Sequence, residues 1–143
     1  MIMTNVYEIH PKVPKASETE KITINLGCVD LGQIDLLVQE GFYSNRTDLI
    51  RTAIRNQLTA HADVVRQTIA RKSLVLGLQH YSRADLEALQ ETNQKLQIQV
   101  LGLATIDADV SPELALATID SLVVLGALHA TPAVKSALAG RIR

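Results

Sequence analysis

The sequence predicts an α+β chain in three parts: a flexible arm at residues 1–20, a strand followed by two helices at residues 21–71, and a three-unit βα repeat with a small parallel sheet at residues 72–143. Two patterns predict this layout. Apolar and polar residues alternate strictly from Lys21 to Leu26, as in a strand with one buried face. The tripeptide Val-Leu-Gly then recurs at residues 75, 100 and 124, which indicates a structural repeat.

The composition is that of a globular protein and excludes several kinds of partner. Apolar residues make up 47% of the 143 positions and charged residues 20%, which suffices for a hydrophobic core. Aromatic residues make up only 3%, so we expect no stacking surface for single-stranded nucleic acid. The formal charge of -1 excludes a polybasic chain that coats DNA or membrane, and any DNA contact must therefore be local.

The start of the chain and its cysteine content favour a cytoplasmic protein. Cys28 has no second cysteine with which to form an internal disulfide. The first residues lack the apolar core of a signal peptide, and no run reaches 18 apolar residues. We therefore expect no membrane partner.

Capping patterns define two helices after the first strand. The pattern from Asp30 to Gln33 predicts a capping box that starts the first helix, which ends near Glu40 with Gly41 in the left-handed conformation. Asn45, with an acidic residue three positions later, predicts the cap of a second helix. No Gly or Pro interrupts the following residues until Gly77, so this helix is expected to run to Arg71, about 40 Å at ~1.5 Å per residue.

Each Val-Leu-Gly repeat is followed by a helix-start signal. Ser82, Ser111 and Thr131 occupy these positions, which predicts strand, turn and helix three times. The strands are nearly continuous apolar runs, which favours a parallel sheet shielded on both faces and arranged as a small right-handed βα solenoid. Close backbone packing explains the lone glycines. The longer loop at residues 105–110 of the middle unit is the one most free to carry something specific.

The N-terminal strand and its two helices bury too little to be stable alone. A dimer with twofold symmetry solves this, because the two strands pair antiparallel and place their apolar side chains on the helices. The expected dimer core consists of Ile22, Ile24, Leu26, Ile34, Leu37, Ile50 and Ile54. The outward residues Lys21, Thr23 and Asn25 are of types that contact bases when a two-stranded ribbon enters the major groove.

Residues 20–60 resemble the ribbon-helix-helix superfamily of CopG, MetJ and Arc type, dimeric DNA-binding proteins of prokaryotes. The resemblance rests on Lys-Ile-Thr-Ile-Asn-Leu at 21–26 and on Gly-Phe-Tyr-Ser-Asn-Arg-Thr-Asp-Leu-Ile-Arg at 41–51. It implies that the outward ribbon residues read bases and that the start of the second helix holds phosphate. The implied phosphate contacts are Ser44, Asn45, Arg46 and Thr47. A helix start is also a physically suitable anion site.

The resemblance implies a transcriptional regulator that binds double-stranded DNA. We expect it to act as a repressor and to be associated with the nucleoid. Residues 21–71 contain six basic and five acidic residues, a net charge of +1, which favours several homodimers on adjacent half-sites. Residues 72–143 are expected to assemble dimers into a tetramer or longer array through exposed sheet edges, or to receive a signal.

Two alternatives stay open. In an antitoxin-type protein, residues 72–143 would bind a protein partner, although such tails are usually disordered until bound. In a partition or DNA-organising protein, the repeats would link dimers along an array. An enzyme is not expected, because no catalytic constellation is present.

Other reactive side chains point to no cofactor and no metal. The four histidines are scattered, and Asp107 and Asp109 lack the surroundings of a calcium loop, so a solvated loop is the preferred interpretation. Cys28 is expected to pack near the end of the strand. Arg51 and Arg55 lie four apart on the second helix and either reach phosphate or form a solvated face with Asp48.

Overall fold

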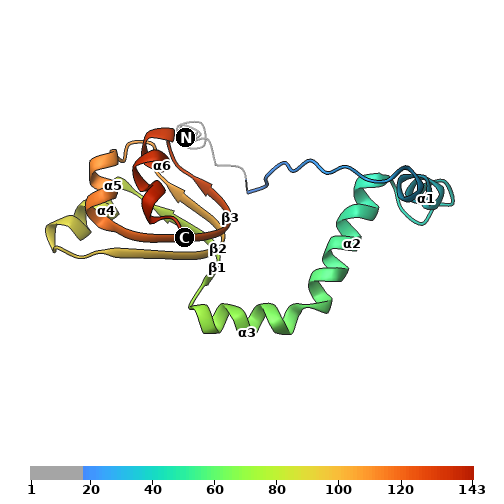
Figure 1. Cartoon of the computed structure of the whole chain (residues 1–143), viewed down its shortest axis with the longest axis horizontal. Coiled ribbons are helices and arrows are strands. Elements are labelled where there is room, and N and C mark those ends of the chain that lie inside the picture. The colour runs from blue at the N-terminus through green and yellow to red at the C-terminus, as the bar shows by residue number, and fades with distance from the viewer. Residues whose placement is uncertain (1–17) are drawn as a thin grey trace, which may run out of the picture. The chain divides into compact units, whose positions relative to one another are not determined.

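The computed structural model describes residues 18–143, so the arm predicted at residues 1–20 lies outside the described residues except for its last three positions. The described chain divides into two compact units (Figure 1). The N-terminal unit is Lys21–Val75, and the C-terminal unit comprises residues 18–20 together with Leu76–Arg143. No helix among the described residues is long and apolar enough to span a membrane.

The first helix starts three residues earlier than the sequence predicts, because its N-cap is Gly27 and not Asp30. Helix α1 is Cys28–Gln39 and has Gly27 as its N-cap, without a side-chain cap. The capping box predicted at Asp30 is therefore wrong; Asp30 lies in the first turn, where its negative charge still favours the helix dipole. The predicted end is confirmed. Gly41 has φ +85°, and its N–H and that of Phe42 donate to the carbonyls of Val38 and Leu37 in a Schellman motif.

The second helix is interrupted, so the prediction of one helix to Arg71 is wrong. Helix α2 is Arg46–Ala60 and helix α3 is Ala62–Lys72, with His61 between them at φ -103° and ψ 12°. The Thr59 hydroxyl donates to the Arg55 carbonyl (2.9 Å), a bond that competes with the regular ladder. His61 and the nearby Asp63 are weak helix formers, and no large apolar side chain lies between Leu58 and Val64.

The C-terminal unit contains three strands, each followed by a helix. The parallel strands lie in the order β1-β2-β3. Ser82, Ser111 and Thr131 cap the three helices, each accepting from a backbone N–H three residues on. The elements are β1 Val75–Tyr81, α4 Arg83–Glu91, β2 Leu96–Ile106, α5 Pro112–Thr118, β3 Ile119–His129, α6 Pro132–Leu138 and the 3₁₀ turn η2 Ala139–Arg141.

The three repeat glycines lie side by side across the sheet. Gly102 is in register with Gly126, and a Cβ on Gly102 would lie 2.1 Å from the Gly77 carbonyl oxygen. A Cβ on Gly126 would lie equally close to the Gly102 carbonyl oxygen. All three have φ between +121° and +142°, which side-chain-bearing residues rarely adopt. Close backbone approach thus explains Gly102 and Gly126, as the sequence predicts, whereas a Cβ on Gly77 would meet no atom within 4 Å and the positive φ explains that glycine.

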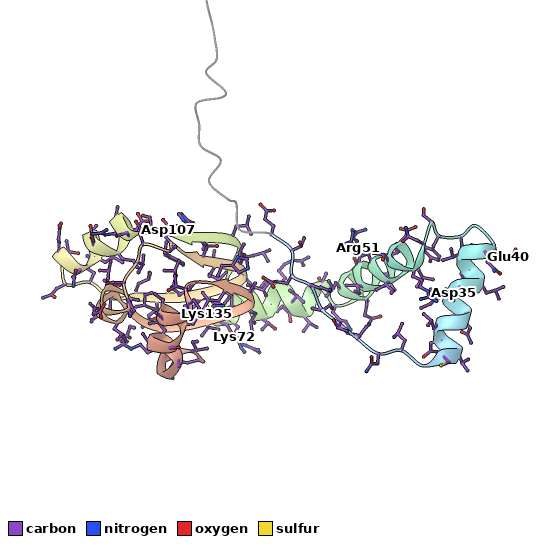
Figure 2. The ribbon with its side chains drawn as sticks, turned by 90° about the horizontal axis from the view of Figure 1, so that it is seen from above. Asp35, Glu40, Arg51, Lys72, Asp107 and Lys135 are labelled. Carbon is purple, nitrogen blue, oxygen red and sulfur yellow. The ribbon has the colours of Figure 1, made fainter. Side chains whose placement is uncertain are left out.

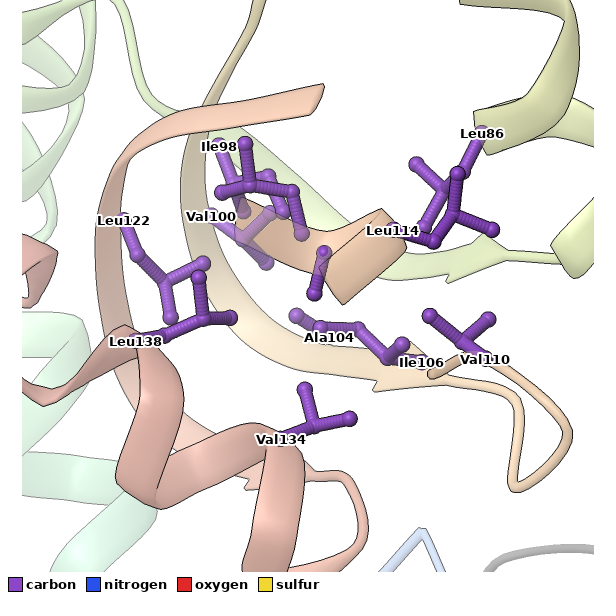
Figure 3. Packing of buried hydrophobic residues seen from close by; sticks show 12 residues of the cluster. Leu86, Ile98, Val100, Ala104, Ile106, Val110, Leu114, Leu122, Val134 and Leu138 are labelled. Carbon is purple, nitrogen blue, oxygen red and sulfur yellow. The ribbon is translucent and has the colours of Figure 1, made fainter. Parts of the chain in front are cut away.

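The helices cover one face of the sheet, so the prediction of a sheet shielded on both faces is wrong. Alternate β2 residues Ile98, Val100 and Ala104 join a single buried cluster with side chains from all three helices (Figure 3). The helical members of the cluster include Leu86 of α4, Leu114 of α5, and Val134 and Leu138 of α6. Because α5 packs against both α4 and α6, the helices form one layer, and no helix of residues 18–143 packs on the opposite face.

Candidate nucleic-acid interface

The segment predicted to read bases is extended and exposed. Residues 21–27 precede α1 without forming a strand in the single chain, because no partner strand lies beside them. Lys21, Thr23 and Asn25 are all exposed. The alternate apolar residues are exposed as well, Ile22 at 74%, Ile24 at 59% and Leu26 at 41% of their surface. The segment therefore presents alternating apolar and polar residues, and none of them is buried by the described part of the chain.

The start of α2 has the geometry of an anion site. The Asn45 side chain accepts from the Asp48 N–H (2.8 Å), so the predicted cap is confirmed, and Asp48 in turn accepts from the Ser44 N–H (3.0 Å). The N–H groups of Arg46 and Thr47 donate to no group within the described residues. Two backbone donors at the positive end of the helix dipole are thus available to a phosphate oxygen.

Arg46 forms an ion pair that the sequence analysis missed. Its Nε and one terminal nitrogen donate to the two carboxylate oxygens of Asp35 on α1, at 2.7 and 2.8 Å. This hydrogen bond lowers the pKa of the Asp35 carboxyl and raises the pKa of Arg46. A guanidinium has five N–H groups, so Arg46 retains donors for a phosphate. The eleven-residue separation across the turn leaves no helical periodicity that could have indicated the pair.

Two further arginines lie on the same helix. Arg51 and Arg55 are exposed on α2, and neither guanidinium forms an ion pair within the described chain (Figure 2 labels Arg51 and Asp35). Asp48, the acidic residue expected to pair with them, instead accepts a hydrogen bond from the Ser44 N–H. The structure therefore leaves open both interpretations of Arg51 and Arg55, a phosphate contact and a solvated helix face.

The residues expected to form a dimer core are not buried in the single chain. Ile34 and Ile50 are half-buried, and Leu37 and Ile54 are exposed at 37% and 47%. Leu74 is the one buried residue among all those described in the N-terminal unit. Helices α1 and α2 thus expose apolar faces that no other part of the described chain covers.

Comparison with known families decides the identity of the fold. A model of the ribbon-helix-helix transcriptional regulator family matches residues 17–135. The chain belongs to this family. Proteins of the family bind DNA, usually as dimers. The match extends through β1, β2 and β3, so the C-terminal repeats belong to the family's architecture together with the N-terminal helices, well beyond the predicted resemblance at residues 20–60. No curated protein and no solved structure matches the chain.

Reactive side chains elsewhere are paired or scattered. The His80 ring and the Asp107 carboxyl group form a hydrogen bond, with 2.5 Å between His80 Nε2 and Asp107 Oδ1. Asp109 lines a surface pocket together with Arg83 and Glu113. No group of three potential metal ligands is present among the described residues. Cys28 is free and exposed at the start of α1. Strand β2 continues to Ile106, so the loop predicted at residues 105–110 is shorter than expected.

Proposed function

We propose that this chain is a transcriptional regulator that binds double-stranded DNA sequence-specifically and acts as a repressor. Two copies pair their Lys21–Leu26 segments antiparallel and insert the resulting ribbon into the major groove. The exposed apolar row at Ile22, Ile24 and Leu26 carries the proposal, because it lies on the same extended segment as the polar row. Burying the first row between copies turns Lys21, Thr23 and Asn25 outward together.

The start of α2 supplies the phosphate contacts in this proposal. The unpaired N–H groups of Arg46 and Thr47, the cap residue Asn45 and the neighbouring Ser44 surround the positive end of the helix. Arg46 adds charge while Asp35 holds its guanidinium in place. Phosphate contacts fix the orientation of the dimer, and the ribbon then discriminates between base pairs.

The charge of the N-terminal unit sets the expected mode of binding. A net charge of +1 over residues 21–71 becomes only +2 in a dimer, so the affinity of one dimer should be modest and strongly salt-dependent. We propose that several dimers bind adjacent half-sites on the nucleoid in the cytoplasm. In this proposal residues 21–71 form the DNA-binding and dimerisation domain. Residues 72–143 assemble dimers or receive a signal.

Selection from a pool of genomic fragments tests this proposal. The purified full chain and a Thr23→Ala/Asn25→Ala variant are each titrated against the pool at two salt concentrations, and the bound fragments are sequenced. The wild type is expected to select repeated short half-sites, whereas the variant keeps weak, salt-sensitive binding. A Gln67→Ala/Gln94→Ala variant is the matched control, because it also removes two exposed uncharged polar side chains.

The distribution of the selected sites separates the alternatives. A small number of promoter sites supports a repressor, while long continuous arrays support a DNA-organising protein. Equal selection by the wild type and the ribbon variant would contradict base contacts by Thr23 and Asn25. The folded C-terminal core disfavours an antitoxin whose tail is disordered until bound. Co-purification of a small protein partner would support that alternative instead.

A further inference from the structure

The sheet face opposite the helices carries exposed leucines that no described helix covers. Strand alternation places seven apolar residues on it, which we call the open face, next to Gln97, Gln99 and Ser121 toward the amino ends of the strands. Leu101 of β2 is in register with Leu125 of β3, and Leu103 with Ala127. Leu76, Leu78 and Leu125 are exposed at 67%, 57% and 51%. The open face consists of Leu76, Leu78, Leu101, Leu103, Val123, Leu125 and Ala127.

A polar row borders the open face at the carboxyl ends of the strands. Thr105 is in register with His129, and His80 lies on the same face of β1. His80 pairs with Asp107, and His129 pairs with Glu20 at 2.6 Å, so these rings are already hydrogen-bonded at the rim. An apolar centre with a satisfied polar rim is the anatomy of a protein interface.

An uncovered face of this kind is unusual for parallel strands. Parallel sheets occur almost only with both faces covered, and contiguous apolar patches of a few hundred Å² on a soluble protein usually mark a binding surface. Here the helices supply one cover, and no described helix packs on the other face, where Leu103 is buried (8% exposed) but Leu76, Leu78 and Leu125 are largely exposed. The open face therefore requires a partner that presents an apolar surface of similar size.

The size of the open face determines which partner fits it. Only three of the seven apolar side chains are largely exposed, so the face offers on the order of a few hundred Å², less than the roughly 800 Å² per partner of a stable independent complex. A second copy of the same chain avoids this limit. Once the N-terminal units have paired, the two C-terminal units belong to one complex, which raises the effective concentration of each for the other.

We propose that the open faces of two copies pack against each other as two aligned sheets, with the leucines of the two copies interdigitating. This inference rests on the proposed N-terminal dimer and adds a second contact between the same two chains. The contact is isologous, so Leu78 and Leu125 of both copies are buried together. The C-terminal repeats are thereby assigned an assembly role, through a face of the sheet rather than through its edges.

Thiol labelling of the full chain tests the proposal. In a Cys28→Ser background, Leu125→Cys places a single thiol on the open face, and its rate of reaction with a maleimide is measured. The same substitution is then combined with Ile24→Glu, which breaks the proposed ribbon. We expect the thiol to react at least tenfold more slowly with the ribbon intact than with the ribbon broken. Light scattering on the same samples gives the mass of each species.

A control thiol outside the open face and the mass of each species separate the possible outcomes. Leu116→Cys lies on α5, outside the open face, and should react at the same rate with the ribbon intact or broken. Equal rates for the Leu125→Cys thiol in a dimer and in a monomer would overturn the inference but leave the N-terminal dimer standing. Slow labelling in a ribbon-broken monomer would also overturn it, since the chain's own residues would then cover the face. A monomeric wild type would refute both proposals.

Discussion

The two units of this chain differ in where their apolar residues lie. In the C-terminal unit, twelve buried residues from the sheet and three helices form one continuous cluster. In the described N-terminal unit only Leu74 is buried, although its extended segment and helices carry as many apolar side chains as a small domain needs. The contrast shows that the C-terminal unit has a hydrophobic core of its own, whereas the described residues of the N-terminal unit leave their apolar faces exposed. The proposed pairing with a second copy would complete the core of the N-terminal unit.

The largest expected effect is a loss of stability in the C-terminal unit, which has a core of its own. Gly102→Ala places a Cβ 2.1 Å from the Gly77 carbonyl oxygen at φ +142°, a clash that backbone cannot relieve cheaply. We expect the stability of the C-terminal unit to fall by about 4 kcal/mol or more. Urea unfolding followed by circular dichroism measures this change.

Two other glycine substitutions calibrate that result. Gly77→Ala meets no atom within 4 Å but still requires φ +125°, so strain alone should cost roughly 1–3 kcal/mol. Gly32→Ala in α1 meets nothing within 4 Å and should be neutral or stabilising. If Gly102→Ala cost no more than Gly77→Ala, the close approach of the strands would be refuted.

The second prediction tests the dependence of the N-terminal unit on a partner chain. Ile24→Glu puts a charge into the proposed dimer core, and we expect the dimer dissociation constant to rise at least about 100-fold, equivalent to ~2.7 kcal/mol. The C-terminal unit should still unfold in a cooperative transition, because Ile24 lies outside its core, and its midpoint should fall only by what the packing of the open faces contributes. Sedimentation across a concentration series measures the first quantity and thermal unfolding the second.

Loss of the cooperative C-terminal transition in Ile24→Glu would contradict the division of stability between the two units. Ile24→Val is the control, since it keeps an apolar branched side chain and should leave the dimer nearly intact.

The third prediction concerns the cap of α2. Asn45→Ala removes the acceptor of the Asp48 N–H and should destabilise the helix by about 1 kcal/mol, because the donor loses its partner. Asn45→Ser restores a capping oxygen and should recover most of the loss. Helix content and DNA affinity should fall together. A loss of affinity with unchanged helix content would instead indicate that Asn45 contacts DNA directly.

The sequence predicted features that local chemistry determines and missed those that depend on long-range contact. The caps at Asn45, Ser82, Ser111 and Thr131 follow from side chains that bond a backbone N–H three residues away, so they are legible in sequence. The helix interruption at His61 was missed because neither Gly nor Pro marks it. The uncovered sheet face was missed because a continuous apolar strand looks the same whether its second cover is a helix or another chain.

The candidate site divides in the same way. The alternation at residues 21–26 and the resemblance at residues 41–51 led to the family that the comparison confirms. The contacts of Lys21, Thr23 and Asn25 with bases stay a prediction. The Asp35–Arg46 pair could not be predicted, because it depends on how α1 and α2 are placed after the turn at Gly41.

The smallest expected effect compares two aspartates, one in each unit. The pKa of Asp35 is lowered chiefly by its hydrogen bond from Arg46, and that of Asp85 chiefly by the backbone N–H of Ser82. In Arg46→Ala the pKa of Asp35 should therefore return toward its ordinary value of 3.8, while that of Asp85 stays low. Carboxyl ¹³C chemical shifts followed against pH measure both values in one sample.

The sign of the pH dependence follows from these directions. A carboxyl whose pKa is lower in the folded chain contributes stability above its unfolded pKa and loses it as the pH falls through the folded value. Because Asp35 and Arg46 are both about half exposed, 0.5 M salt should screen their interaction and move the pKa of Asp35 upward. Asp85 accepts from a fixed backbone N–H and should respond less to salt. Equal responses of the two aspartates would show that Arg46 does not hold Asp35, and the guanidinium would then be unrestrained at the start of α2.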